Sequence, residues 1–357
     1  MQGEPLGPSG HMPAPMALAS NPPAFSPEEA RRTAVELYAI DAEPEVKPSE
    51  RDRNFRIDGG PDADIVLKLC NVEEDPAVIG FQIAGLRHVE AVDPGLPVPR
   101  VVPTVAGELV TRVRSEAGED LMVYALTYLP GLSLHHVEPT PELMGSIGVA
   151  VARLDVALRS FTHAAPGQAL VWDIRQAEAL RGYLPLIADA DGRRLASAAL
   201  DRFAHHTLPT YAGLRHQVIH NDANRGNLLV SPERPQPVSG IIDFGDMVFA
   251  PLVLEISTSA MELAAPAADP IGLTAAFLAG YVHVTPLGAD EVECVYDGLM
   301  TRLAVGTAVY AWRAAFKAEP RFDAGSVAAR FIGEMQRLEA IGREAANARF
   351  HAVCLTG

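Results

Sequence analysis

Two short aliphatic runs, each bordered by carboxylates, constrain this chain more than any other feature of its sequence. In the first, HNDANRGNLLV (220–230), a histidine, an aspartate and several asparagines stand directly in front of two leucines and a valine. In the second, SGIIDFGD (239–246), two aspartates follow an aliphatic pair. A carboxylate beside a buried strand needs a partner or a ligand, because an unpaired charge is costly to bury. Two such strands so close together predict a polar site.

The length and composition predict a globular protein without a membrane span. With 357 residues, of which 48% are hydrophobic, the chain can bury one large core or two modest ones. Its longest apolar runs end well before the roughly 18 residues that a bilayer span needs. Residues 1–25 lack the basic head and apolar block of a secretory signal, so we expect a flexible tail. GHM (10–12) resembles a cloning scar, so part of this tail need not be native.

Charge and cysteine content limit the partners. The net charge of −16 opposes binding to nucleic acid, which depends on basic residues that release counterions, and favours neutral or cationic small molecules. Cys70, Cys294 and Cys354 are odd in number and far apart, so they predict neither a disulfide framework nor a zinc site. We therefore expect a cytoplasmic protein that binds small molecules and neither nucleic acid nor a membrane. The sequence does not indicate an oligomeric state.

The first part of the chain has the pattern of a small β-rich lobe. SPEE (26–29) is a capping box with proline in the first helical position, which predicts a helix from 27 to 40. Residues 42–69 read as short strands, and 76–92 repeat apolar residues at helical spacing. Further strands are expected at 98–104, 107–114 and 120–128.

Beyond Gly131 the chain consists of long segments rich in Ala, Leu and Arg, in which only the two acid-bordered runs read as strands. Helices are expected at 140–164, 174–188, 192–206, 251–265, 270–282, 288–317 and 326–347. We therefore predict an α+β fold with a small antiparallel β lobe at 26–131 and a larger, mainly helical lobe at 132–357. In such an architecture a ligand binds in the crevice between the lobes.

The two acidic strands carry the chemistry of phosphoryl transfer. Asp222, five residues before Asn227, can aim a carboxylate at a substrate hydroxyl while the amide oxygen ligates a metal from the same loop. Asp243, at the end of the next strand, would supply the second ligand. Hard oxygen donors suit Mg²⁺, whose coordination nucleotide phosphates usually complete. His220 is expected to bond backbone groups rather than to take part in the chemistry.

Lys68 strengthens this interpretation. It lies inside the predicted strand VLKL, at the place where a kinase-like fold needs a lysine that contacts the phosphates. It is also one of only three lysines in the chain, with Lys47 and Lys317. Strand lysine, helix, hinge, catalytic loop and metal aspartate also occur in the order that a bilobal kinase requires. Structural alternatives stay open: Asp222 could cap a turn that Asn227 closes, Asp243 could be a solvated strand end, and Lys68 could lie along an edge strand with its charge in water.

Six segments together resemble a known family. They are ERDRNFRI, IVLKL, YLPG, WDI, VIHNDANRGNLLV and SGIIDFGDM. The chain resembles the aminoglycoside phosphotransferase and choline kinase family, the small-molecule branch of the protein-kinase-like fold. It is most similar to the hydroxylysine-kinase-like members, over about residues 26–350. The resemblance implies Asp222 as the general base, Asn227 and Asp243 as Mg²⁺ ligands, and Lys68 as the contact to the α- and β-phosphates.

The resemblance also implies a nucleotide site. The loop SERDRNF (49–55) would lie over the phosphates; it has no glycine, so Arg51 and Asn54 are the candidates for polar contacts. Tyr128 and Leu129 belong to the hinge whose backbone would meet the base. Recognition through the main chain leaves ATP and GTP both open.

Two positions depart from the family's pattern. Gln82, on the helix after the lysine strand, stands where the fold commonly has a glutamate that pairs with the lysine, so Lys68 must be held less firmly or by another acid. Asn221 stands where many phosphotransferases have glycine, which hydroxylysine-kinase-like sequences accept. Only a few residues separate Asp246 from Pro251, so no long segment is present to dock a peptide, and a small substrate is expected.

The residues that would bind the acceptor are predicted from charge and aromatic character. An aromatic ring beside a carboxylate suits an ammonium group, and an arginine suits a carboxylate. The candidates are Asp246, Trp172, Asp173, Arg225, Glu255 and Arg302. The alternative is that the tryptophan is a core residue and the charged side chains lie on helix faces or pair with one another.

The sequence thus predicts a Mg²⁺- and nucleotide-dependent kinase that phosphorylates the hydroxyl of a small amine-bearing metabolite of the hydroxylysine, ethanolamine, choline or homoserine type. One alternative is the same chemistry on an aminoglycoside, as in antibiotic resistance. Another is a nucleotide-binding pseudokinase without transfer activity, which only Gln82 suggests. A helical binding module without a nucleotide would require both acidic strands to be accidental.

Overall fold

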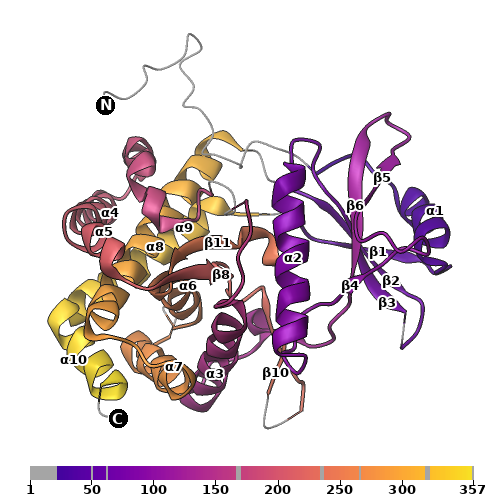
Figure 1. The fold of residues 1–357 in the computed structure, drawn as a ribbon. Helices are drawn as coiled ribbons and strands as arrows, with labels where there is room; N and C mark the ends of the chain where they lie inside the picture. Colours follow the sequence, from indigo (N-terminus) through magenta and orange to yellow (C-terminus); the bar gives the residue numbers. More distant parts are fainter. Residues whose placement is uncertain are drawn as a thin grey trace.

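The structure is a computed structural model that describes residues 22–49, 51–61, 63–165, 170–233, 237–264, 267–317 and 322–355. Most of the tail expected at 1–25 lies outside the described residues. Figure 1 shows a β-sheet with helix α1 on its outer side, helix α2 on its inner side and a larger body of helices beyond α2. The predicted α+β fold with two unequal lobes is confirmed.

The small lobe contains a six-stranded antiparallel sheet with the order β1-β2-β3-β6-β4, in which β5 also pairs with β6. The strands are β1 Pro44–Lys47, β2 Arg53–Asp58, β3 Asp64–Leu69, β4 Val101–Val102, β5 Thr111–Arg114 and β6 Asp120–Thr127. Strands β4 and β5 are shorter than expected because the chain turns between them, where Gly107 N–H donates to Thr104 O. Pro103, beside β4, has no N–H to offer the sheet.

Strand β3 separates apolar side chains from one cation by simple alternation. Successive side chains point to opposite faces of a strand. Ile65, Leu67 and Leu69 are buried in a cluster with residues of helix α1 (Pro27–Tyr38). Lys68 therefore points to the opposite face, which carries α2, and it is only 7% exposed there. The strand thus places a buried ammonium group on the side of the sheet that faces the larger lobe.

Both helices of the small lobe begin with the caps that the sequence predicts or permits. In α1, Ser26 and Glu29 form the expected capping box, each accepting the other's backbone N–H. Helix α2 (Pro76–Val92) is capped by Asp75, whose side chain accepts the N–H of Ala77. Ile79, Phe81, Ile83, Leu86 and Val89 of α2 belong to the same core cluster as the buried apolar residues of the helical lobe. This helix therefore joins the sheet to the rest of the molecule (Figure 1).

The larger lobe is mainly helical, as predicted. Its α-helices are α3 Pro141–Leu158, α4 Ala190–Arg202, α5 Leu208–Thr210, α6 Val253–Ala264, α7 Pro270–Val284, α8 Ala289–Phe316, α9 Ala324–Ile341 and α10 Arg343–Cys354. The segment expected as a helix at 174–188 is a 3-10 helix, Ile174–Leu186. The single helix expected at 326–347 is wrong: the chain breaks at Gly342, whose φ of +83° only glycine adopts readily.

The expectation of only two strands beyond Gly131 is also wrong. The structure has β7 Leu132–Ser133, β8 His216–Ile219, β9 Leu228–Val230, β10 Val238–Ile241 and β11 Val248–Pro251. They form a three-stranded sheet, β10-β9-β7, and a two-stranded sheet, β11-β8. Strands of two to four residues are too short to show an alternating pattern, and β8 meets β11 only after the chain has folded back on itself. These two small sheets hold both polar loops.

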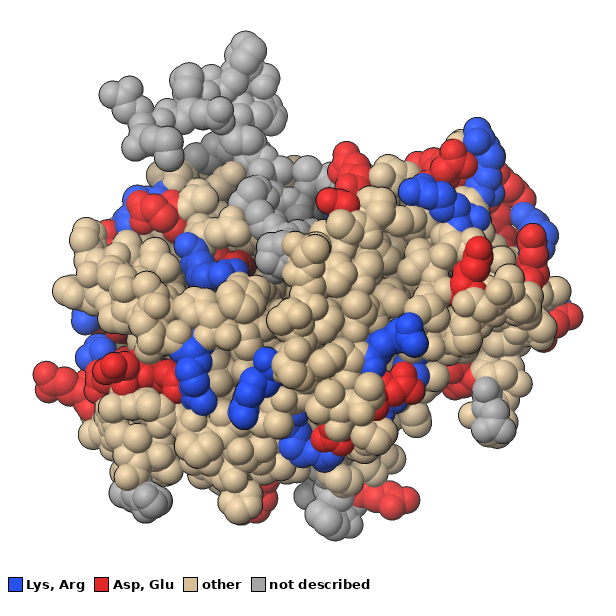
Figure 2. Space-filling view, in the orientation of Figure 1, with Lys and Arg blue, Asp and Glu red and all other residues tan. Residues whose placement is uncertain are grey.

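The described residues contain no helix that is both long and apolar enough to cross a membrane. On the face shown in Figure 2, lysine and arginine side chains stand singly between acidic and uncharged residues. This face of the described chain therefore offers no continuous basic surface of the kind that nucleic acid binding uses.

The packing of α3 on α7 yields a prediction about stability. A Cβ atom on Gly148 would lie 2.1 Å from Phe277 O. We therefore expect Gly148→Ala to lower the free energy of unfolding by about 1–3 kcal/mol, because overpacking forces two helix backbones apart. Gly80→Ala, where an added Cβ meets nothing within 4 Å, should raise it by roughly 0.5–1 kcal/mol through helix propensity. Urea unfolding measures both changes; equal midpoints for the two variants would contradict this packing.

Candidate active site

A cavity of about 510 Å³ lies between the two lobes. Its walls come from the segment before β2, from β3 and α2 on one side, and from the loops after β8 and β10 with α6 and α8 on the other. Its polar lining includes Arg51, Asp52, Lys68, Glu74, Gln82, His135, Asp222, Asn224, Asn227, Asp243, Asp246, Glu262 and Arg302. The structure therefore brings together the four residues on which the sequence interpretation depends.

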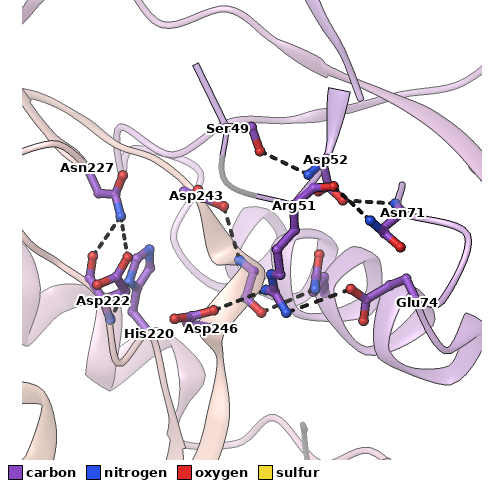
Figure 3. A network of polar contacts seen from close by, with 12 residues as sticks. Ser49, Arg51, Asp52, Asn71, Glu74, His220, Asp222, Asn227, Asp243 and Asp246 are labelled. Atoms are coloured by element: carbon purple, nitrogen blue, oxygen red, sulfur yellow. Dashed lines mark hydrogen bonds and ion pairs between the residues drawn. The ribbon is translucent and has the colours of Figure 1, made fainter. Parts of the chain in front are cut away.

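The loop after β8 fixes the carboxylate of Asp222 from two sides. The Nδ2 of Asn227 donates to Asp222 Oδ2 at 2.7 Å and to its main-chain oxygen at 2.9 Å. The Nδ2 of Asn224 donates to Asp222 Oδ1 at 2.9 Å. Figure 3 shows Asn227 directly above Asp222, with both bonds from the same amide group. The carboxylate thus has a defined position in the cavity before any ligand binds.

Ile242 ties this loop to the strand that carries the second acid. Its N–H donates to Asn227 O at 2.9 Å, and its carbonyl lies 3.1 Å from His220 Nε2. The other ring nitrogen of His220 accepts the N–H of Asp222 at 3.2 Å, so the ring bonds backbone on both sides. His220 therefore has the structural role expected from the sequence. Asp243, which follows Ile242, is held beside Asn227 by this main-chain connection.

Asn227 and Asp243 present oxygen donors that fit Mg²⁺. Because Asn227 uses its Nδ2 toward Asp222, its Oδ1 is left without a hydrogen-bond partner in the described part of the chain. Asp243 has a left-handed backbone, with φ of +63° and ψ of +79°, and accepts the N–H of Gly245 through Oδ1. A carboxylate and an amide oxygen are the hard donors that Mg²⁺ prefers. The donor set present thus suits this ion.

Lys68 joins the two lobes electrostatically. Its Nζ lies 3.5 Å from Asp243 Oδ1 and 3.9 Å from Asp52 Oδ2. Burial alone would lower the pKa of Lys68, but Tyr124 and then the carboxylates of Asp243 and Asp52 raise it well above its usual value. The Lys68 charge in turn holds the pKa of Asp243 below its usual range, although burial acts in the opposite direction. Both groups are therefore charged, and the ammonium group stands next to the expected metal ligand.

Asp222 and Asp246 are held less favourably as anions. Burial raises the pKa of Asp222 well above its usual value, and the charge of Asp246 adds to this effect, while Arg302 opposes it. Burial likewise raises the pKa of Asp246, and Arg51, 3.4 Å away, opposes it. A carboxylate with raised proton affinity is what a general base for a hydroxyl requires.

Comparison with known proteins decides the family. A sequence profile described as the phosphotransferase enzyme family matches residues 45–291, more than half of the chain. The chain belongs to this phosphotransferase family. Among its relatives, the hydroxylysine kinase of Danio rerio is 25% identical over 299 residues, which cover 80% of this chain and 84% of that protein. The hydroxylysine kinase of Mus musculus is 28% identical over 273 residues, which cover 70% of this chain and 72% of that protein.

Solved structures of similar fold confirm the protein-kinase-like architecture of this phosphotransferase. An amicoumacin kinase, described in complex with AMP-PNP, Ca²⁺ and Ami, superposes with a TM-score of 0.66 at 15% identity, over 88% of this chain and 94% of that one. A microcompartment-associated aminopropanol kinase has a TM-score of 0.63 at 17% identity, over 89% of this chain and 98% of that one. At these identities the similarity shows the fold.

Gln82 of the phosphotransferase does not pair with Lys68. Its Nε2 donates to Gly245 O at 3.3 Å, and its Oε1 accepts from Tyr124 OH at 3.4 Å. The acids near the ammonium group are instead the two aspartates described above. The sequence left open whether another acid would replace the missing glutamate, and in the structure Asp52 and Asp243 are closest to that role.

Glu255 lies behind the loop after β8 and does not line the cavity. It is fully buried and accepts the N–H of Asn221 at 2.7 Å and the hydroxyl of Ser259 at 3.2 Å. Asn221 has a φ of +64°, a left-handed conformation that places Asp222 at the turn into the cavity. Glu255 therefore stabilises the loop rather than contacting an acceptor. Residue type and spacing alone do not distinguish these two roles for a carboxylate on α6.

Several other candidates lie outside the cavity lining. Asp173 caps the 3-10 helix and pairs with Arg175 at 2.6 Å. Arg225 donates to the carbonyls of Leu134 and Val137, so its guanidinium supports the neighbouring chain.

The candidates for the nucleotide are placed in different ways. Arg51 lines the cavity. Asn54 pairs with Lys68 in the β2–β3 register but does not line the cavity. Tyr128, the first residue after β6, borders a separate groove and donates its N–H to Asp64 O, and Leu129 follows it. Roles for these residues in nucleotide binding stay predictions.

Among the cavity residues that sequence reasoning missed are Asp52, Glu74, Glu262 and Tyr310. Asp52 adjoins Arg51 in the loop that the sequence did single out, so its position was an available signal. Glu262 is seven residues after Glu255 on α6, which puts it on the same helix face by spacing, but no motif includes it. Tyr310 comes from the middle of α8 and has no local signal.

Asn221 allows a test of the loop conformation. Asn221→Gly should keep or slightly raise the free energy of unfolding, because glycine adopts a positive φ at no cost. It also removes a buried amide nitrogen that has no partner among the described residues. Asn221→Ala should lower it by about 1–2 kcal/mol through strain in the left-handed region. Urea unfolding of the two variants provides the comparison. An alanine variant as stable as the glycine variant would show that this residue is not held at positive φ.

Proposed function

We propose that this phosphotransferase is a Mg²⁺-dependent kinase that transfers the γ-phosphoryl group of ATP or GTP to a hydroxyl of a small amine-bearing metabolite, of the hydroxylysine, ethanolamine, choline or homoserine type. The observation that carries the proposal is the meeting of Asp222, Asn227, Asp243 and Lys68 at one cavity. Relatives named hydroxylysine kinase, and a kinase of similar fold described with AMP-PNP and Ca²⁺, support the reaction and its co-substrates.

Four residues of the cavity have defined roles in this proposal. Asp222 accepts the hydrogen bond of the acceptor hydroxyl and takes its proton as the phosphoryl group is transferred. Asn227 and Asp243 would hold Mg²⁺, which when bound neutralises charge on the phosphates. Lys68 contacts the nucleotide phosphates and gives up part of its interaction with Asp52 and Asp243 to do so. Catalysis then consists mainly of positioning and charge stabilisation.

The charges of the cavity favour a cationic acceptor. Glu262 lines the cavity and has no hydrogen bond or ion pair among the described residues, whereas most other acids there are bonded. Asp246 also lines the cavity, and its only hydrogen bond or ion pair among the described residues is the 3.4 Å contact to Arg51. Carboxylates that lack close partners bind ammonium groups readily. This supports an amine-bearing acceptor over a neutral alcohol.

The alternatives make different predictions. An aminoglycoside phosphotransferase would use the same base and metal ligands, and drug-dependent nucleotide turnover would identify it. A pseudokinase would bind nucleotide without transfer; its only support, Gln82, is weakened because two aspartates lie close to Lys68. We also propose a cytoplasmic location, which suits three free cysteines, two of them buried.

Replacement of the base tests the reaction. Asp222→Asn keeps the shape of the side chain but cannot accept the hydroxyl proton, so we expect kcat to fall about 10²–10⁴-fold. The assay follows ADP or GDP release with hydroxylysine, ethanolamine, choline, homoserine and an aminoglycoside as acceptors. Arg349→Lys is the matched control, since Arg349 pairs with Asp269 on the surface. Absence of any Asp222-dependent turnover across this panel would refute the enzymatic proposal.

The metal site is tested by nucleotide binding, independently of turnover. AMP-PNP should raise the melting temperature of the wild-type protein more with Mg²⁺ than with EDTA, because a ligand that binds only the folded state stabilises it. Asp243→Asn should abolish the part of this shift that depends on Mg²⁺, since an amide neither neutralises nor ligates the ion as well. A full Mg²⁺-dependent shift in the variant would remove Asp243 from the metal site.

A further inference from the structure

Arg302, on α8, is an unusual cation in this cavity. It lines the cavity and is only 3% exposed. Its Nη1 donates to the carbonyl of Trp172, and its guanidinium carbon lies 5.0 Å from the centre of the Trp172 ring. A guanidinium held by both a carbonyl and an aromatic face has little freedom to rotate. Arg302 is therefore oriented before a substrate binds.

The N–H donors on the remaining edge of this guanidinium, Nε and Nη2, are not fully hydrogen-bonded. Nε is buried and has no hydrogen-bond partner in the part of the chain that the structure describes. Nη2 lies 3.5 Å from Asp222 Oδ1, which is longer than the roughly 2.7–2.9 Å of a good charge-assisted hydrogen bond. Nε and Nη2 form the side edge of the guanidinium, the fork that binds a carboxylate with two parallel bonds. A buried donor without a partner costs stability, and a ligand or water that bonds it removes this cost.

From this geometry we infer that the acceptor carries a carboxylate, which the Nε and Nη2 edge of Arg302 binds beside Asp222. The inference rests on the proposed kinase function and narrows its acceptor to hydroxy amino acids rather than amino alcohols. The carbonyl and ring of Trp172 hold the guanidinium in place, and the shared contact to Asp222 brings the acceptor hydroxyl to the base. Glu262, elsewhere in the same cavity, remains available for an ammonium group of the same molecule.

Arg302 could instead serve only to orient and neutralise Asp222, with no contact to the acceptor. The two roles differ in one measurable way. Replacing a residue that only positions the base changes kcat/KM by the same factor for every acceptor. Replacing a residue that binds the carboxylate lowers kcat/KM for the acid much more than for the matching amine.

The test therefore compares pairs of acceptors that differ only in the carboxylate. Hydroxylysine is paired with 1,5-diaminopentan-2-ol, and homoserine with 3-aminopropan-1-ol. For the wild-type protein we expect kcat/KM to favour the acid of at least one pair by about tenfold or more, since hydrogen bonds to charged groups are worth factors of that order. Arg302→Gln and Arg302→Lys should bring this ratio close to one. Arg349→Lys should leave it unchanged.

The same pairs are titrated calorimetrically into the wild-type protein loaded with Mg²⁺ and AMP-PNP, so that the comparison does not depend on turnover. Tighter binding of the acid, lost in Arg302→Gln, supports the inference even if the chemical step is slow. If amines and acids react or bind equally well, or if the variants change both by the same factor, the inference is overturned while the kinase function stands. If no acceptor of either kind reacts or binds, both are rejected.

Discussion

The site depends on a main-chain connection between two loops. Ile242 donates to the carbonyl of Asn227 and accepts from His220, so the loop after β8 and the end of β10 are joined on both sides. Backbone groups give this connection a fixed geometry that side chains alone would not provide. This main-chain connection fixes the positions of Asp222 and Asp243. The left-handed backbone at Asn221 and Asp243 turns both carboxylates toward the same cavity.

The second constraint is a single buried cation from the other lobe. Alternation along β3 puts Lys68 opposite the apolar residues that pack on α1, and α2 covers the lysine's side of the sheet. A buried ammonium group is stable only near carboxylates, which are Asp52 from its own lobe and Asp243 from the other. This pairing relates the lobes electrostatically, and it also explains why Gln82 can replace an acid on α2.

Much of the site was predictable because its signals are local. A carboxylate five residues before an asparagine, an aliphatic pair before an aspartate and a lone strand lysine each occupy a few adjacent positions, and the structure brings them to one cavity. Candidates chosen by residue type alone were less informative. Asp173, Arg225 and Glu255 are charged residues near the right segments, but each is bonded to neighbouring structure. Type does not reveal which way a side chain points.

The sequence by itself determined the class of fold, the order of the functional segments and the chemistry that Asp222, Asn227, Asp243 and Lys68 can perform, because these follow from periodicity and spacing. Only the tertiary structure decided that Asp52 and Asp243 accompany the lysine, that Glu262 and Arg302 share the cavity, and that the short strands β8 and β11 pair. Such contacts join residues far apart along the chain. Their geometry is set by packing of the whole core, which no short segment encodes.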